Sequence, residues 1–139
     1  MRILVCGGRN YAVPPPNATA QERALARRQL VCIGQALSDY CSRGVETDTV
    51  IHGGASGADN AAGRMARELN LEVEVHPADW KKHGRAAGPI RNQEMLDSGV
   101  DLVLAFPGGR GTADMVRRAR EAGVEVKEIN EEEFFRGRV

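Results

Sequence analysis

The sequence predicts an α/β protein with a doubly wound, mainly parallel sheet. Two observations lead to this fold class. Short apolar runs alternate along the chain with segments of helical periodicity, and glycine stands at the junctions between them. A chain of 139 residues has the length of one domain with its own core. We therefore expect a single domain, spanning residues 1–139, with helices on both faces of its sheet.

Five short apolar runs are expected to be strands, and with helices between them they give a Rossmann-like arrangement. The expected strands are 3–6, 49–52, 71–75, 101–106 and 124–129. The run 101–106 is the most apolar of the five. In such sheets ligands bind beyond the carboxyl ends of the strands, where every strand-to-helix loop lies.

The first helix carries the clearest local signals. Thr19 and Glu22 have the spacing of a capping box, in which each side chain satisfies the other residue's backbone N–H. An apolar face follows, with residues three or four apart: Ala26, Leu30, Ile33 and Leu37. Gly44 is expected to end this helix. Before it, residues 7–18 contain three consecutive prolines and are expected to form a loop.

The remaining helices are placed by their flanking residues. Gly57 leads into a helix that ends near Leu69, and a loop is expected over residues 76–87. Pro89 suits the first turn of a helix over 89–96, because its missing N–H is not needed there. A helix over 112–122 is expected to end before Gly123 as the C′ residue, and 131–135 fits a last short helix.

Three glycine-rich junctions lie at the expected carboxyl edge: Gly7-Gly8-Arg9, Gly53-Gly54-Ala55-Ser56-Gly57 and Pro107-Gly108-Gly109-Arg110-Gly111-Thr112. Glycine lets a ligand approach the backbone closely, and a helix N-terminus attracts anions. Thr112 adds a hydroxyl and Arg110 a fork of donors. Glycines can also serve only to make tight turns, but three such loops at one edge favour binding of a phosphorylated ligand.

Composition and the absence of other motifs narrow the function. Lys+Arg and Asp+Glu are both 19, so a nucleic acid, whose binding usually needs a basic excess, is not the expected partner. Cys6, Cys32 and Cys41 have no C-x-x-C spacing and are read as reduced thiols of a cytoplasmic protein. No signal peptide or membrane span is found. The three histidines lack metal-ligand spacing, so no metal or cofactor is expected.

An ordered set of motifs resembles the SLOG superfamily, and within it the YspA-related branch. Pro107–Thr112 is similar to the P-G-G-x-G-T motif of that superfamily, and the resemblance runs from residue 1 to about 122. The set also contains the first two glycine junctions with Asp59, Trp80, and the segment 87–95 with Arg91 and Asn92. The resemblance implies a Rossmann-like fold, a nucleotide or nucleotide-derived ligand, and a homo-oligomer, often a dimer.

The superfamily includes the Lonely Guy phosphoribohydrolases, which cleave the glycosidic bond of nucleoside monophosphates. Arg91 falls at their arginine position, but Asn92 replaces the following lysine and Met115 replaces the glutamate. Glycosidic cleavage needs a carboxylate near the developing positive charge. Asp59, Asp79 or Glu94 could supply one, and in an enzyme Arg91 and Asp59 would be the catalytic pair.

The leading interpretation is therefore a domain that senses or sequesters a nucleotide-like ligand. A phosphoribohydrolase is the alternative. A DNA-associated module, by analogy with the superfamily member DprA, is a third reading that the zero net charge weakens.

Three side chains keep two readings each, and Ser56 keeps one. Asp59 is either an acid stabilised by a helix dipole or a partner of a ribose hydroxyl. Arg91 is either an ion-paired surface residue or a ligand contact. Trp80 is either a core residue or a platform for a base. Ser56 lacks the G-x-S-x-G context of a nucleophile and is better explained as a phosphate donor.

Overall fold

The five strands pair in one all-parallel sheet, as the sequence predicts. The computed structural model describes residues 1–41 and 48–138. The strands are β1 (Arg2–Cys6), β2 (Thr49–His52), β3 (Glu72–Val75), β4 (Leu102–Ala105) and β5 (Glu125–Glu128). Their order is β3-β2-β1-β4-β5, so the direction of winding reverses between β1 and β4. This switch point is where such sheets leave a crevice at their carboxyl edge.

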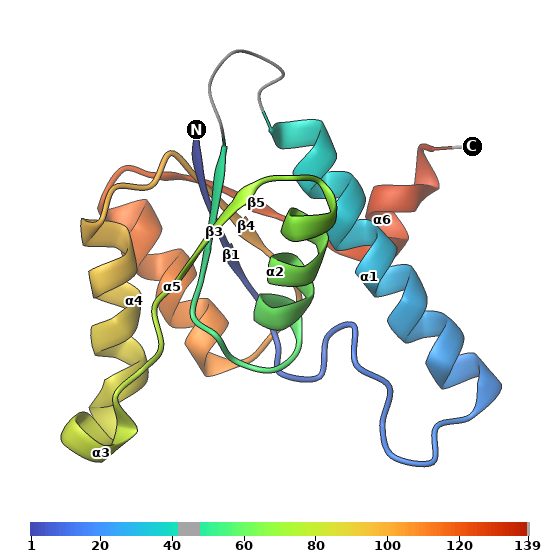
Figure 1. Cartoon of the computed structure of the whole chain (residues 1–139), viewed down its shortest axis with the longest axis horizontal. Helices are drawn as coiled ribbons and strands as arrows, with labels where there is room; N and C mark the ends of the chain where they lie inside the picture. Colours follow the sequence, from blue (N-terminus) through green and yellow to red (C-terminus); the bar gives the residue numbers. More distant parts are fainter. Residues whose placement is uncertain (42–47, 139) are drawn as a thin grey trace.

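Helices cover both faces of the sheet, which confirms the doubly wound fold (Figure 1). Helices α1 (Ala20–Tyr40), α2 (Ala58–Glu68) and α6 (Glu131–Arg136) pack on one face. Helices α4 (Ala87–Asp97) and α5 (Arg110–Glu121) pack on the other. Between β3 and α4 lie α3 (Trp80–His83) and the 3₁₀ turn η1 (Gly84–Ala86).

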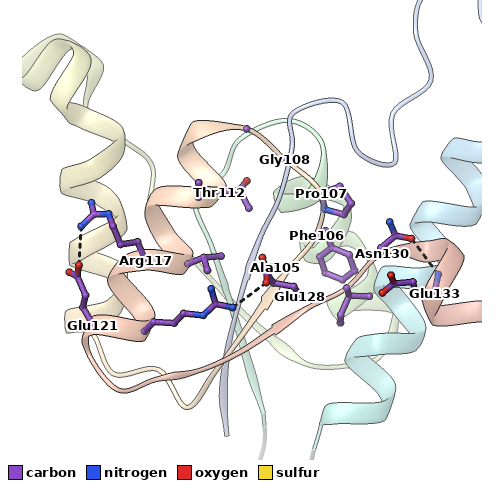
Figure 2. A pocket seen from close by; sticks show the side chains of 15 residues that line it. Ala105, Phe106, Pro107, Gly108, Thr112, Arg117, Glu121, Glu128, Asn130 and Glu133 are labelled. Carbon is purple, nitrogen blue, oxygen red and sulfur yellow. Dashed lines mark hydrogen bonds and ion pairs between the residues drawn. The ribbon is translucent and has the colours of Figure 1, made fainter.

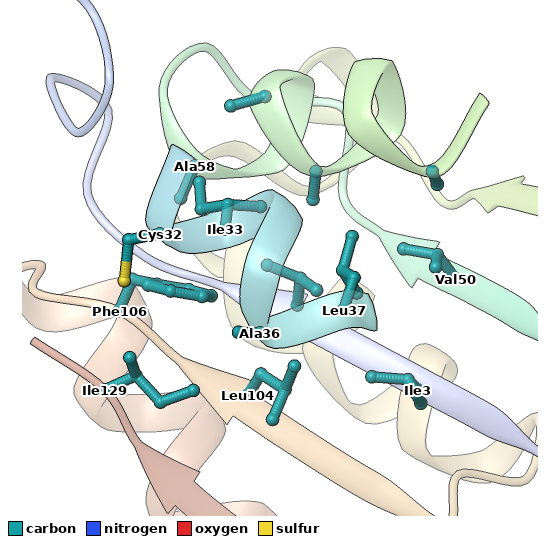
Figure 3. Close-up of a cluster of buried hydrophobic side chains, with 14 of the residues drawn as sticks. Ile3, Cys32, Ile33, Ala36, Leu37, Val50, Ala58, Leu104, Phe106 and Ile129 are labelled. Carbon is teal, nitrogen blue, oxygen red and sulfur yellow. The ribbon is translucent and has the colours of Figure 1, made fainter. Parts of the chain in front are cut away.

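The alternation of side chains along β1 supplies both cores. Ile3 and Val5 belong to the cluster under α1 and α2, whereas Leu4 and Cys6 belong to the cluster under α4 and α5. Figure 3 shows Ile33 and Leu37 of α1 lying over this first face. Because β1 is buried on both sides, the loop that follows it is anchored firmly at the switch point.

Two local signals are found where the sequence predicts them. The capping box is present: Thr19 Oγ1 accepts the Glu22 N–H at 3.1 Å, and Glu22 Oε1 accepts the Thr19 N–H at 3.0 Å. Gly123 has a φ of +74°, as a C′ residue should. Gly44, expected to end the first helix, lies outside the described residues.

Three boundaries differ from the prediction. The segment 76–87 is not a plain loop, because it contains α3 and η1; Asp79 caps α3 by accepting the Lys82 N–H at 3.1 Å. α4 begins two residues before Pro89, and α5 begins two residues before Thr112. A four-residue helix is too short to show periodicity, and neither α4 nor α5 has a side-chain N-cap to mark its start.

Some strands are also shorter than expected. β3, β4 and β5 lose one residue at one or both ends relative to the predicted runs. Within the described ranges, none of the helices combines the length and apolarity needed to cross a membrane.

Candidate functional site

The three glycine junctions meet at the carboxyl edge of β1. The Gly8 N–H donates to the Pro107 carbonyl at 2.8 Å, and the Gly8 carbonyl accepts the Ala58 N–H at 3.1 Å. A Cβ on Gly7 would come within 2.6 Å of the Ala58 Cβ, and one on Gly8 within 2.9 Å of the Pro107 carbonyl oxygen. Glycine is needed at both positions because backbone from three different loops converges there.

In the loop after β2, residues 53–57, the first three backbone N–H groups are occupied by neighbouring side chains. Asp59 Oδ2 accepts the N–H groups of Gly53 at 3.0 Å and Ala55 at 3.3 Å. His52 Nδ1 accepts the Gly54 N–H at 3.0 Å. The N–H of Ala58, which opens α2, is already bonded to Gly8. We call residues 53–57 the closed loop, because the N–H groups of residues 53, 54 and 55 are all occupied; among the described residues, only those of Ser56 and Gly57 have no partner in this loop.

Asp59 and Arg91 both serve this closed loop. Arg91 Nη1 donates to the Gly53 carbonyl at 2.7 Å, which ties α4 to the end of β2. Burial raises the pKa of Asp59, which is only 7% exposed, against the opposing effects of the Ala55 N–H, the Arg91 charge and the Gly53 N–H. Asp59 and Arg91, both predicted to contact a ligand, therefore each bind a backbone group of the closed loop in the structure.

Ser56 is engaged as well, because its Oγ donates to the Arg9 carbonyl at 3.3 Å. This contact joins the closed loop to the loop after β1.

The loop after β4 is the opposite case. Among the described residues, the N–H groups of residues 108 to 112 have no hydrogen-bond partner. Gly109 is the N-cap of α5 and contributes no side-chain cap. A Cβ on Gly109 or Gly111 would meet nothing within 4 Å, so packing does not explain why these two residues are glycine. We call residues 108–112 the open loop.

Thr112 and Arg110, the two side-chain donors that the sequence analysis assigned to the phosphate, both belong to the open loop. A Cβ on Gly108 would lie 2.3 Å from Thr112 Oγ1, so the hydroxyl packs over that glycine. Arg110 is exposed beside it. Five free amides, a hydroxyl and a helix N-terminus make this loop suited to an anion.

Asn92 fixes the open loop from behind. Its Nδ2 donates to the Gly111 carbonyl at 3.2 Å and to Asp114 Oδ2 at 3.0 Å, and its Oδ1 accepts from Arg91 Nε at 3.3 Å. Burial raises the pKa of Asp114, but the bonds from Asn92, Arg118 and Arg117 outweigh it, and the pKa lies below its usual value. Asn92 thus positions the first turn of α5 through the Gly111 carbonyl and Asp114, and it uses none of the free N–H groups of the open loop.

Two cavities flank the segment Pro107–Gly109. The first, which we call the α5–β5 cleft, has a volume of about 730 Å³ (Figure 2). Apolar residues form its walls: Phe106, Ala113, Val116 and Ile129. The second, the switch-point groove, has a volume of about 450 Å³ and is lined by Arg9, Asn10, Tyr11 and Gln29 together with Gly8.

Sequence reasoning missed the residues that shape these cavities. Tyr11 Oη donates to Glu131 Oε2 at 3.0 Å and Gln29 Nε2 donates to Glu131 Oε1 at 3.2 Å, which joins the loop after β1 to α6. Asn130 caps α6 and also lines the cleft. Asn before an acidic first turn is a capping signal, but nothing local to these residues indicates that they face a cavity.

Two further positions are decided by burial. Met115, at the glutamate position of the Lonely Guy enzymes, is 0% exposed within the core under α4 and α5. Trp80 is 52% exposed, so its reading as a core residue is wrong. Its reading as a platform for a base stays a prediction.

Comparison with known proteins agrees with this architecture. The family model described as "YspA, cpYpsA-related SLOG family" matches residues 1–83, more than half of the chain. The chain belongs to this family. The match includes the loop after β1, the closed loop and Asp59, and it confirms the resemblance inferred from the sequence motifs. The open loop and Arg91 lie beyond the matched range.

A phage protein is among the relatives of this SLOG-family chain. This chain is 44% identical to the Gene 61 protein of Mycobacterium phage D29 over 101 residues, which cover 68% of this chain and 81% of the phage protein. No solved structure matches the chain. Membership of the SLOG family supports a nucleotide-related role in general, in binding or in modification.

Proposed function

We propose that this protein binds a nucleotide or nucleotide-derived small molecule through a phosphate held at the open loop, and so senses or sequesters that ligand. The observation that carries the proposal is a run of five N–H groups, at residues 108–112, that have no partner in the described part of the chain and lie at the start of a twelve-residue helix. Unpaired amides at a helix N-terminus, with the dipole behind them, are a general means of binding phosphate.

The glycines of the open loop support the same proposal. Glycine in the first turn of an exposed helix costs about 0.5–1 kcal/mol relative to alanine. At Gly111 no internal contact compensates for that cost, because a Cβ there would meet no atom within 4 Å. A ligand phosphate that approaches the backbone would account for the missing side chain.

Binding is favoured over cleavage by the positions of the acidic groups. The position of the hydrolase glutamate is occupied by the buried Met115. The carboxylate of Asp59, the proposed substitute, accepts two N–H bonds of the closed loop. Arg91 donates to the Gly53 carbonyl. A phosphoribohydrolase would have to break these contacts to recruit either side chain.

A screen of phosphorylated compounds tests the proposal. The chain would be melted with nucleoside mono-, di- and triphosphates, cyclic nucleotides and dinucleotides. A ligand present at 100 times its Kd stabilises the folded state by about 2.7 kcal/mol, which raises the melting temperature by several degrees. If no phosphorylated compound shifts the transition, the proposed function is wrong.

The same samples decide between binding and cleavage. Incubation with nucleoside monophosphates, followed by chromatography, would detect free base and ribose 5-phosphate. We expect neither product. Product that disappears in Arg91→Ala would identify a phosphoribohydrolase instead. Assembly into a homo-oligomer stays a prediction from the resemblance, to be measured by light scattering with and without ligand.

A further inference from the structure

We infer that the α5–β5 cleft receives the ring of a mononucleotide whose phosphate occupies the open loop, while the switch-point groove does not. The inference rests on the proposed function and adds where the rest of the ligand lies. Both cavities begin at the Pro107–Gly109 segment, so a phosphate at the open loop could belong to a ligand extending into either one. Their walls distinguish the two.

The cleft has more apolar lining residues than the groove. Ala113 is exposed there, whereas Phe106, Val116 and Ile129 are 1%, 7% and 9% exposed, and Thr112 lies at the end next to the open loop. Figure 2 shows Gly108 and Thr112 at one end and the charged residues farther along the cleft. A volume of about 730 Å³ lies within the range of pockets that enclose small ligands.

The groove offers less. Its one aromatic residue, Tyr11, packs against Phe106 at 5.4 Å between ring centroids and donates its hydroxyl to Glu131. Both polar atoms of the Gln29 side chain are also used, because Oε1 accepts the Ala12 N–H at 2.8 Å and Nε2 donates to Glu131. Arg9 and Asn10 remain, and they suit a phosphate or solvent better than a ring.

Charge orients the ligand within the cleft. Beyond the apolar walls the rim carries three carboxylates and two guanidinium groups: Glu121, Glu128, Glu133, Arg117 and Arg120. Arg120 pairs with Glu128 at 3.1 Å, and Arg117 pairs with Glu121 at 3.3 Å. In the described part of the chain the Glu133 carboxylate has no ion pair. The net negative rim repels a phosphate, which leaves the open loop for the phosphate and the cleft for the uncharged ring.

Two matched substitutions test the assignment, because each fills one cavity from an exposed position. Ala113→Phe places a ring in the cleft, and Asn10→Phe places one in the groove. Ala24→Phe, on the exposed side of α1 and in neither cavity, controls for a phenylalanine on a helix. The probes are AMP, GMP, CMP, UMP and ribose 5-phosphate, with affinities measured by calorimetry.

We expect the best nucleoside monophosphate to bind at least tenfold more weakly to Ala113→Phe, and within twofold of wild type to Asn10→Phe and Ala24→Phe. Ribose 5-phosphate should bind to Ala113→Phe within threefold of wild type. In ¹⁵N and methyl NMR spectra, ribose 5-phosphate should shift the amides of residues 108–112. The full nucleotide should also shift the methyl groups of Val116 and Ile129.

The opposite results are equally clear. If Asn10→Phe weakens nucleotide binding and Ala113→Phe does not, the ring lies in the groove and the inference is wrong, while the proposed function stands. If the nucleotide shifts neither the methyl groups of Val116 and Ile129 nor the amides of residues 108–112, phosphate binding at the open loop is wrong as well.

Discussion

The loops after β2 and β4 have much in common. Each carries three glycines, and each leads into a helix whose N-cap is a glycine without a side-chain cap. In the closed loop, His52 and Asp59 accept the N–H groups of residues 53–55, and Arg91 donates to the Gly53 carbonyl. The Gly8 carbonyl accepts the N–H of Ala58 at the start of α2. In the open loop the amides of residues 108–112 have no partner among the described residues. Glycine content alone therefore does not identify an anion site; the state of the backbone donors does.

The largest contrast is expected between two glycine-to-alanine substitutions. Gly57 has a φ of +85°, and a Cβ there would lie 2.2 Å from the Gly8 carbonyl oxygen. Gly57→Ala should lower the free energy of unfolding by at least about 3 kcal/mol, from backbone strain and a forced separation of the loops. Gly111→Ala meets no atom and should raise it by about 0.5–1 kcal/mol.

Urea denaturation of both variants measures these changes. Equal effects at the two positions would show that the loops are not structurally distinct. Gly111→Ala should also weaken binding of any phosphorylated ligand, since it narrows the approach to the backbone.

The second largest effect is a pH dependence that arises beside the closed loop. Burial, with the nearby charges of Arg67 and Arg91, lowers the pKa of His52 to about 4, and the ring is 3% exposed. The unfolded ring titrates near 6.5, so the unfolded state binds the extra proton between these two values. Stability should therefore be complete above pH 6.5 and fall by up to about 3 kcal/mol as the pH decreases toward 4.

His52→Asn isolates this contribution, because its amide oxygen can accept the Gly54 N–H without titrating in that range. Denaturation of both proteins from pH 4 to 7.5 should show a smaller slope in the variant. Parallel curves would mean that His52 titrates normally in the folded protein.

Substitutions of Asp59 and Thr112 are expected to have intermediate effects, on stability for Asp59 and on phosphate affinity for Thr112. Asp59→Ala leaves the N–H groups of Gly53 and Ala55 without their acceptor and should cost about 2 kcal/mol of stability. Thr112→Val keeps the shape of the side chain and should change stability by less than about 0.5 kcal/mol. It should weaken phosphate binding by about 1 kcal/mol, or roughly fivefold, through the lost hydroxyl.

Thermal unfolding with and without ligand distinguishes the two roles. A variant of Asp59 that stays stable but loses nucleotide affinity would move the ligand to the closed loop.

The smallest effect is expected at Trp80. This residue begins α3, five positions beyond the end of β3, and it lines neither of the two cavities. Figure 1 shows α3 beside the start of α4 and on the opposite side of the molecule from α6. Trp80→Ala should change stability by less than about 0.5 kcal/mol and nucleotide affinity by less than twofold. A larger loss of affinity, or quenching of the single tryptophan by a nucleotide, would restore its role as a platform for a base.

Much of the fold follows from local signals. The alternation of apolar runs and helical segments predicted all five strands, and the capping box placed the start of α1 at Ala20. The short helix α3 was missed because four residues carry no periodicity. For the site, local patterns named the residues that gather at the carboxyl edge, but they did not separate those that face a ligand from those that hold the loops.

That separation required the hydrogen bonds of the folded chain, some local and some between distant residues. Arg91 and Asp59 have the chemistry of ligand contacts, yet their hydrogen bonds go to the closed loop, 38 residues away for Arg91 and Gly53. The α5–β5 cleft lies between two elements that follow each other in the chain, but the fold also brings Phe106 and Glu133 into its lining.

By itself, the sequence determined the fold class, the glycine positions and the helix start signals, because each depends on residues close together in the chain. Only the tertiary structure decided which glycine loop remains open. A backbone donor is free or occupied according to what the folded chain brings against it. In the closed loop the acceptors are His52 and Asp59, which flank the loop in the sequence and reach the N–H groups of residues 53–55 only in the folded conformation. Among the described residues, the N–H groups of residues 108–112 stay without a partner, although that loop has the same number of glycines.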